Sequence, residues 1–141
     1  FFLSTQAFAL VGDATDAKTI ADSQQVSPAA YVFYAGSVVL SGEKQRAGLG
    51  KCQTFDQKWM VLLAVKDVSD VRGGQKRRSI AGPLIHKVLN ALQGYVLSTL
   101  SSDLSSFLPL KLESEEQPIY SDDGYAYFGY EFSTRMSVNA T

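Results

Sequence analysis

The stretch from residue 79 to residue 95 constrains the fold of this chain more than any other. Its large apolar residues recur at spacings of one, three and four, which places them on one stripe of an α-helix. They are Ile80, Leu84, Ile85, Val88, Leu89 and Leu92. The opposite, polar face would carry His86, Lys87, Asn90 and Gln93. Burying six such side chains is worth on the order of 10 kcal/mol before entropy is counted, so this helix must lie on a sheet or another helix.

The two ends of this helix carry different signals. Gly94 follows the last apolar position, where a residue in the left-handed conformation often ends a helix. Pro83 suits a first helical turn, because proline lacks the N–H group and its ring clashes with a preceding turn. The helix therefore begins near Pro83, or it begins near Lys76 and bends. We expect a start between Lys76 and Ser79.

Three other stretches have the composition or the alternation of β-strands. Residues 29–40 are rich in aromatic and β-branched residues, and Gly36 within them predicts a bulge. Residues 54–68 are apolar on both faces at their centre, which is typical of a central strand that is covered on two sides. Residues 125–138 alternate apolar and polar, which predicts a half-buried antiparallel strand.

Shorter segments complete the expected order of elements. Residues 7–11 predict a short strand, and residues 14–23 a short helix that an N-cap side chain at Asp13 or Asp16 could begin. Residues 107–113 alternate with Leu108, Leu110 and Leu112 on one face, and Pro109 restricts this strand to an edge. Residues 69–78, 114–118 and 121–124 predict turns.

The chain therefore predicts an α+β fold in a single domain over residues 1–141. We expect a mostly antiparallel sheet of about four or five strands, with one long and one short helix packed on it. Apolar residues make up 45% and charged residues 19%, which is an ordinary globular balance. Because the chain begins with Phe1 rather than methionine, we also expect an N-terminal segment to precede it.

Residues 41–53 are rich in glycine and charge and lie between two predicted strands, so we expect a long mobile loop that a partner orders. Basic residues gather in this loop and again before the long helix. The predicted protein interface consists of Glu43, Lys44, Arg46, Lys51, Arg72, Lys76, Arg77 and Arg78. A merely solvated charged surface and a phosphate contact are the alternatives, although no aromatic residues for base stacking are interleaved.

Nothing in the sequence predicts a catalytic, cofactor or metal site. His86 is the only histidine and Cys52 the only cysteine, which leaves too few ligands for zinc and excludes an internal disulfide. The acidic residues near the end of the chain fit neither an EF-hand nor helix-borne carboxylate pairs, so a solvated turn is the simpler interpretation. They are Glu113, Glu115, Glu116, Asp122 and Asp123. With a net charge of -1, the chain has no global field to attract nucleic acid.

The chain resembles the tail terminator (tail completion) proteins of long-tailed bacteriophages over about residues 28–134. Two runs carry the resemblance, WMVLLAVKDVSDVRGG at residues 59–74 and AGPLIHKVLNALQGY at residues 81–95. The segments PAAYV at residues 28–32 and EFST at residues 131–134 also fit. Pro83 within the helix and a tyrosine rather than a tryptophan at Tyr95 depart from the family pattern.

This resemblance implies a structural virion protein and not an enzyme, without cofactors. Such proteins form a hexameric ring that caps the tail tube, ends its polymerisation and provides the surface to which the head joins. The implied partners are further copies of the chain, the tail tube protein and a head completion or connector protein. The implied location is the head-proximal end of the virion tail, after assembly in the host cytoplasm, and genomic DNA would pass through the lumen without sequence-specific binding.

Two alternatives stay open at this point. One is another head–tail connector or minor tail protein of similar fold, which only neighbouring subunits would distinguish. The other is an unrelated small hydrolase or nucleic-acid-binding domain, which a hydrolytic activity lost on His86→Ala or a steep salt dependence of DNA binding would reveal.

Overall fold

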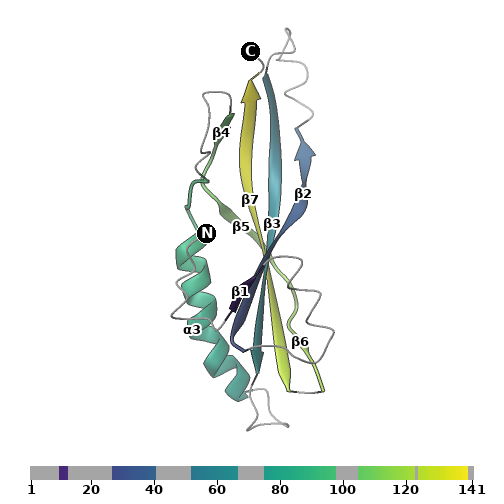
Figure 1. The fold of residues 1–141 in the computed structure, drawn as a ribbon, viewed down its shortest axis with the longest axis vertical. Helices are drawn as coiled ribbons and strands as arrows, with labels where there is room; N and C mark the ends of the chain where they lie inside the picture. The colour runs from purple at the N-terminus through teal and green to yellow at the C-terminus, as the bar shows by residue number, and fades with distance from the viewer. Residues whose placement is uncertain are drawn as a thin grey trace.

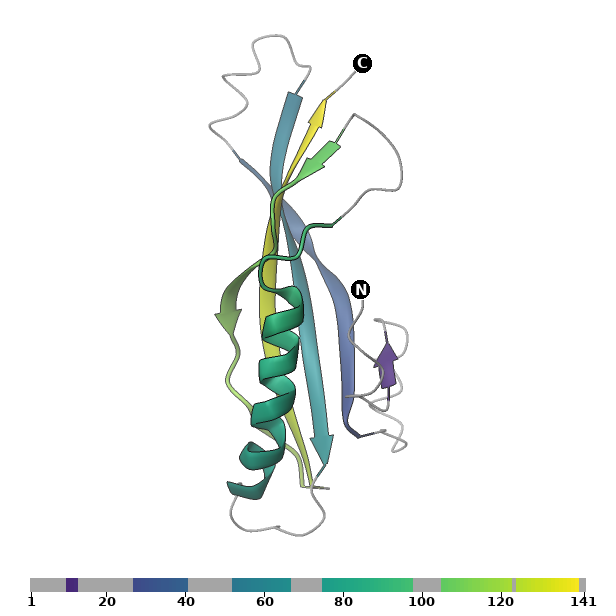
Figure 2. The same ribbon diagram turned by 90° about the vertical axis from the view of Figure 1, so that its left-hand side faces the viewer.

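The computed structural model describes residues 10–12, 27–40, 52–66, 75–97, 105–122 and 124–139. The elements in chain order are β1 (Leu10–Gly12), β2 (Ala29–Val39), β3 (Cys52–Lys66), α3 (Gln75–Leu92), β4 (Ser105–Phe107), β5 (Lys111–Glu115), β6 (Ile119–Tyr120) and β7 (Tyr125–Asn139). Figure 1 shows long strands that run along the length of the molecule, and Figure 2 shows α3 lying along one face of the sheet.

The sheet is mostly antiparallel, as predicted. Its strand order is β1-β2-β3-β7, and β4, β5 and β6 all pair with the remaining side of β7. Only β1 and β2 run parallel to each other. The expected number of strands across the sheet is therefore confirmed. The expected number of helices is not, because α3 is the single helix in the part of the chain that the structure describes. The short helix predicted over residues 14–23 lies outside the described residues.

β3 and β7 form the centre of the sheet. Their register runs without a shift from Cys52 opposite Asn139 to Lys66 opposite Tyr125. The two strands are rich in aromatic and β-branched residues and contain no proline, which suits long strands. β3 begins at Cys52, so the last two residues of the loop predicted over residues 41–53 belong to a strand, whereas residues 41–51 lie outside the described residues.

β2 contains the predicted bulge. Its register against β3 shifts between Tyr34 and Gly36, and Gly36 has a φ of 107°, a backbone conformation that glycine adopts without a steric penalty. The extra residue at the bulge shifts the alternation of β2 by one, so that odd-numbered side chains after it lie on the face that even-numbered ones occupy before it. Tyr34 and Ser37 consequently share a face, and the Tyr34 hydroxyl donates a hydrogen bond to Ser37 Oγ at 2.8 Å.

The long helix begins one residue before the expected window, at Gln75, so residues 75–78 are helical and not part of a turn. Pro83 lies inside the helix rather than at its first turn. The predicted end is confirmed: Gly94 has a φ of 81°, and the Tyr95 N–H donates to the Leu92 carbonyl at 3.0 Å. His86 lies on the exposed face as expected, and its Nε2 atom lies 2.9 Å from Nδ2 of Asn90.

The buried stripe of α3 differs from the predicted stripe at its first position. Ile80 is 41% exposed, whereas Ala81 is fully buried with Leu84, Val88 and Leu92. The helical spacing allows either residue to begin the stripe, and the sequence analysis chose the larger side chain. The prediction that Ile80 is buried is therefore wrong, because a small side chain at Ala81 lets the helix approach the sheet closely.

The core lies between α3 and the sheet, and a second buried cluster lies on the other face. The main core contains the α3 stripe together with side chains from β3 and β7. The latter are Val61, Leu63, Val65, Ala126, Phe128, Tyr130 and Phe132. On the opposite face Ala29, Tyr31 and Ala64 are buried, with Phe33, Leu62 and Tyr127 packed against them. On this second face of β3, Ala64 is buried whereas Met60 and Leu62 are partly exposed, so the prediction that β3 is covered on both faces is confirmed only in part.

The segment before the last strand departs from the predicted alternation. Leu110 is 1% exposed, but Leu108 is 55% and Leu112 is 38% exposed, so the three leucines do not share a face. Between β4 and β5 the Leu110 N–H turns to the Tyr95 carbonyl at 2.7 Å, which rotates the Leu110 side chain into the core. Pro109 lies in this break, and both short strands lie at the edge beside β7, as proline there implies.

The connection from β5 to β7 contains fewer turn residues than predicted. β5 extends to Glu115, and β6 occupies residues 119–120, which the sequence analysis did not assign to a strand. The predicted turn at residues 121–124 is confirmed: the Gly124 N–H donates to the Ser121 carbonyl at 3.1 Å, and Gly124 has a φ of 91°.

The buried Tyr130 makes the stability of the fold sensitive to alkaline pH. Its hydroxyl donates to Glu115 Oε1 at 3.2 Å, and burial together with this carboxylate raises the Tyr130 pKa far above its ordinary value of 10.0. Because the unfolded tyrosine ionises first, the stabilisation is complete below about pH 10 and is lost as the pH rises further.

We therefore expect the free energy of unfolding to fall more steeply above pH 10 in the wild type than in Tyr130→Phe. Urea denaturation at a series of pH values from 8 to about 11 would measure the difference. Tyr120→Phe, at an exposed tyrosine, is the matched control and should keep the wild-type slope. Equal slopes for the wild type and Tyr130→Phe would contradict the prediction.

Candidate functional site

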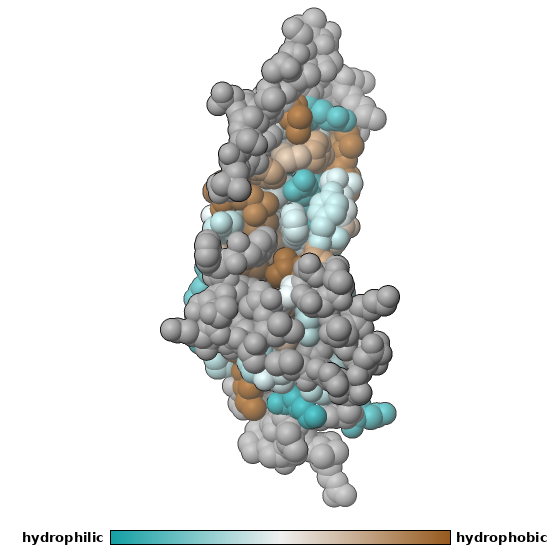
Figure 3. Space-filling model, in the orientation of Figure 1, coloured by the Kyte–Doolittle hydropathy of each residue, from teal (hydrophilic) through white to brown (hydrophobic). Residues whose placement is uncertain are grey.

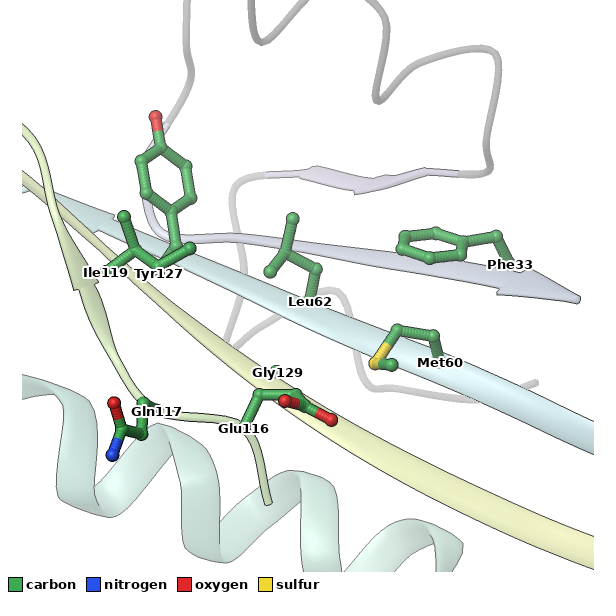
Figure 4. A pocket seen from close by; sticks show the side chains of 8 residues that line it. All are labelled: Phe33, Met60, Leu62, Glu116, Gln117, Ile119, Tyr127 and Gly129. Atoms are coloured by element: carbon green, nitrogen blue, oxygen red, sulfur yellow. The ribbon is translucent and has the colours of Figure 1, made fainter. Parts of the chain in front are cut away.

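An apolar cleft lies on the face of the sheet that points away from α3. It has a volume of about 640 Å³. Figure 4 shows side chains from three long strands and from the β5–β6 connection around it. The lining residues are Phe33, Met60, Leu62, Glu116, Gln117, Ile119, Tyr127 and Gly129.

A glycine in the middle of β7 lets the β5–β6 connection lie close to the strand. Gly129 lies opposite Leu62, and the side chains of Glu116 and Met60 border the space that its own side chain would occupy. A Cβ atom added at Gly129 would lie 3.2 Å from Cβ of Glu116, so the connecting chain approaches β7 more closely than a larger residue would easily allow. The Glu116 N–H donates to the Gly129 carbonyl at 2.9 Å, which fixes this approach.

The cleft has the chemistry of a contact surface rather than of a reaction centre. Its walls are mostly aliphatic, aromatic or thioether groups with the amide of Gln117, and Glu116 is its single carboxylate. The other lining residue with a titratable side chain is Tyr127, and none of the lining residues is a histidine, lysine or cysteine. In the described part of the chain, no group of three or more histidine, cysteine, aspartate or glutamate side chains could hold a metal ion.

Charged cross-strand pairs occupy the same face beyond the cleft. Lys58 Nζ donates to Glu131 Oε1 at 3.0 Å, and Arg135 Nε donates to Asp56 Oδ1 at 3.0 Å. Their side chains are partly exposed, so each pair adds little to stability. Asp56 and Arg135 lie directly opposite each other in the register, and opposite charges in such positions favour the observed pairing of β3 with β7.

The edge strand β5 is joined to this charged region through Glu113. The Ser133 hydroxyl donates to Glu113 Oε1, and Lys111 Nζ lies 2.9 Å from the same oxygen. The hydrogen bond from Ser133, followed by that from Lys111, holds the Glu113 pKa below its ordinary value. This contact satisfies Ser133, which is buried, and the Thr134 hydroxyl likewise donates to the Leu108 carbonyl.

The structure separates the acidic residues that cluster in the sequence. Glu113 contacts Ser133, Glu115 contacts Tyr130, and Glu116 borders the cleft. Asp122 lies in the turn before β7, and Asp123 is outside the described residues. They do not form one cation site, and each described contact is made with a neutral hydroxyl or a lysine.

The residues of the predicted interface are placed only in part. Glu43, Lys44, Arg46, Lys51 and Arg72 lie outside the described residues. Lys76, Arg77 and Arg78 follow Gln75 in the first turns of α3. The interface that they were predicted to form remains a prediction.

The sequence analysis did not find the cleft. Two signals for it are present: a second apolar face of β3 formed by Met60, Leu62 and Ala64, and an isolated glycine within the alternating strand β7. Glycine within a strand can mark a close approach of another chain segment. The walls, however, come from segments that are up to about a hundred residues apart, so their meeting depends on the sheet order.

The long sheet leaves further apolar side chains at the surface. β3 and β7 have 15 residues each, a length of about 50 Å, whereas the 18 residues of α3 span about 27 Å. Figure 3 shows hydrophobic patches beside hydrophilic ones over the upper part of the molecule. Exposed apolar residues on a sheet that is longer than the helix packed on it are typical of a protein that assembles with others.

The fold and these surfaces therefore define an α+β assembly protein. The family model for phage tail terminator proteins matches residues 4–141, nearly the whole chain, and the chain belongs to this family. No curated protein matches the sequence. The family gives the protein a structural role in the phage tail and implies association with other tail or head proteins in the virion. No described helix is long and apolar enough to cross a membrane.

Proposed function

We propose that this protein forms a ring that caps the tail tube, ends tail polymerisation and provides the surface to which the head joins. The observation that carries this proposal is the match to the tail terminator family over residues 4–141. The ring would be hexameric, would contact the tail tube protein on one side and a head completion or connector protein on the other, and would act without catalysis or a cofactor. Assembly would occur in the host cytoplasm, and DNA would pass through the lumen.

The surface chemistry supports a role in assembly. Large apolar side chains are more than two-fifths exposed toward both edges of the sheet. They are Tyr34 and Val38 in β2, and Ile119 and Tyr120 in β6. A cyclic ring of identical subunits needs two different surfaces on each subunit, because the contact is heterologous. Exposed side chains on opposite sides of the sheet meet this requirement.

The first turns of α3 also favour a role for the predicted basic interface. Lys76, Arg77 and Arg78 follow the start of the helix, and the first turn contains no acidic residue. The positive end of the helix dipole favours acidic side chains in the first turn, and the sequence has basic ones there instead. We infer that these residues, with those of the loop over residues 41–53, contact a negatively charged surface of a tail or head protein.

The test is polymerisation of purified tail tube protein with and without this protein. We expect tubes to stop elongating once it is added, and negative-stain images should show extra density at one end of each tube. Tubes that keep growing with bare ends would overturn the proposal. Native mass measured by light scattering would show whether the ring forms alone or only on the tube.

The loop contribution is tested in the same assay with Lys44, Arg46 and Lys51 replaced together by serine. We expect weaker capping and a lower yield of infectious particles, with an unchanged unfolding transition. Lys87→Ser, at an exposed lysine of α3, is the control and should leave both measurements unaffected. Full capping by the triple variant would contradict the assignment of the loop while leaving the ring proposal in place.

A further inference from the structure

Within the described part of the chain, β2 has no strand partner along most of its outer edge. β1 pairs with β2 only at residues 29–31, and none of the other described strands pairs on this side. Residues 32–39 include no charged residue and no proline. Three of their large side chains are exposed, namely Tyr34 at 51%, Val38 at 52% and Val39 at 44%. Soluble proteins usually protect an edge strand with charges, proline or a covering segment, so this edge indicates a partner strand.

The opposite side of the sheet ends in a second edge, which β5 and β6 form. All residues of both strands are exposed. Leu112, Ile119 and Tyr120 place three large apolar side chains there, beside the charged Lys111, Glu113 and Glu115 of β5. The Leu112 N–H is turned away from β7, and Gln93 Oε1 accepts its hydrogen bond at 3.1 Å. A neighbouring strand at this edge would have to replace this side-chain contact.

The strand directions make the two edges compatible. β2 is antiparallel to β3, β3 to β7, and β7 to β5, so β2 and β5 run in opposite directions. When two copies lie side by side with their sheets in the same orientation, β2 of one copy meets β5 of the next as an antiparallel pair. This is the more stable type of pairing.

The register also places the two edges at the same level. Tyr34 lies opposite Trp59, Trp59 opposite Phe132, and Phe132 opposite Leu112. In the same way the register connects Val32 with Glu115 through Val61 and Tyr130. A neighbouring copy can therefore pair its β5 with β2 by a rotation with little shift along the strands. A heterologous contact without such a shift closes into a ring when the rotation between neighbours is a whole fraction of a turn.

We propose that the β2 edge of one copy pairs with the outer edge of β5 in the next copy and that this junction, repeated, joins the sheets around the ring. The proposal rests on the proposed function, since it names the contact between the subunits of that ring. The strand that pairs with β2 comes from a second copy of the chain, because each chain has both edges. Their strands run in opposite directions and are in register across the sheet. Pairing of β2 with β2 would be isologous and would stop at a dimer.

Disulfide trapping tests this junction directly. Tyr34→Cys and Leu112→Cys are combined in a Cys52→Ser background, because directly opposed residues of an antiparallel pair lie within disulfide distance. After oxidation of assembled protein, we expect a ladder of linked chains up to the full ring on a non-reducing gel. A mixture of the two single variants should give dimers only. No linkage in assembled rings, or dimers from Tyr34→Cys alone, would overturn the proposal.

A charge at the edge provides an independent test. Tyr34→Lys should block strand pairing, so that the native mass falls from that of the ring to the 15.3 kDa of one chain. Val96→Lys, at a side chain that is 48% exposed and outside the sheet, is the matched control and should still form rings. Rings formed by Tyr34→Lys would refute the junction but not the proposed function. Wild-type protein that neither forms rings nor caps tubes would refute the proposed function itself.

Discussion

Replacing Leu110 by alanine is expected to lower the free energy of unfolding by about 2–5 kcal/mol. Leu110 is 1% exposed and belongs to the same buried cluster as Leu92 and Phe132, although it lies in an irregular segment between two short strands. Removing its side chain loses the transfer free energy of several methyl and methylene groups and leaves a cavity. Since small domains are stable by only about 5–15 kcal/mol, the loss should be visible as a much lower urea midpoint.

Leu108→Ala is the matched control for this prediction. The two leucines are two residues apart and flank Pro109, but Leu108 is 55% exposed, so its replacement should change stability by no more than about 0.5 kcal/mol. The hydrogen bond from Thr134 ends on the Leu108 backbone carbonyl and survives the substitution. Equal losses at both positions would show that the leucines alternate on one buried face and that the described break in the strand is wrong.

Replacing Pro83 by alanine is expected to raise the free energy of unfolding by about 1–3 kcal/mol. Pro83 lies in the interior of α3, eight residues after Gln75, and is exposed. There its ring displaces the preceding turn, and its missing N–H leaves the Ser79 carbonyl without the usual helical donor. Alanine restores the donor and loses no buried contact.

The outcome at Pro83 distinguishes two positions for the start of the helix. If the helix began at Pro83, the proline would occupy the favoured first position, and alanine would be neutral or destabilising. Urea unfolding followed by circular dichroism at 222 nm would measure both stability and helix content. Lys87→Ala, further along the exposed face of the same helix, should change stability by less than about 0.5 kcal/mol under either alternative.

Local sequence patterns sufficed for the elements that bury one complete face. β3, β7 and α3 were predicted because their apolar periodicity extends over many residues, and the position of Gly94 was enough to place the end of the helix. Patterns failed where neighbouring choices were equivalent or where the chain turns. Ile80 and Ala81 both fit the helical stripe, and only the close approach of helix and sheet selects the smaller residue. Leu110 is buried through backbone hydrogen bonds with Gly94 and Tyr95, which no local alternation encodes.

The candidate surfaces were less predictable than the fold because they depend on strand order. The cleft needs Gly129 beside Leu62 and Glu116, and these residues come from three different segments. The open edge of β2 is visible in the sequence as an uncharged strand, yet its exposure follows only from the short length of β1. The basic interface was predicted from charge alone and stays a prediction.

The place of β7 in the chain determines when the molecule can fold. β7 follows every other described strand in the sequence, and it is the only described strand with which β4, β5 and β6 pair. During synthesis β2 and β3 are therefore made first and wait for a partner more than fifty residues away, a separation that slows folding. The second edge of the sheet forms only once β7 has joined the first. A subunit in which β7 has not yet joined consequently lacks the β5 edge, and under the proposed junction it cannot extend an assembly from that side.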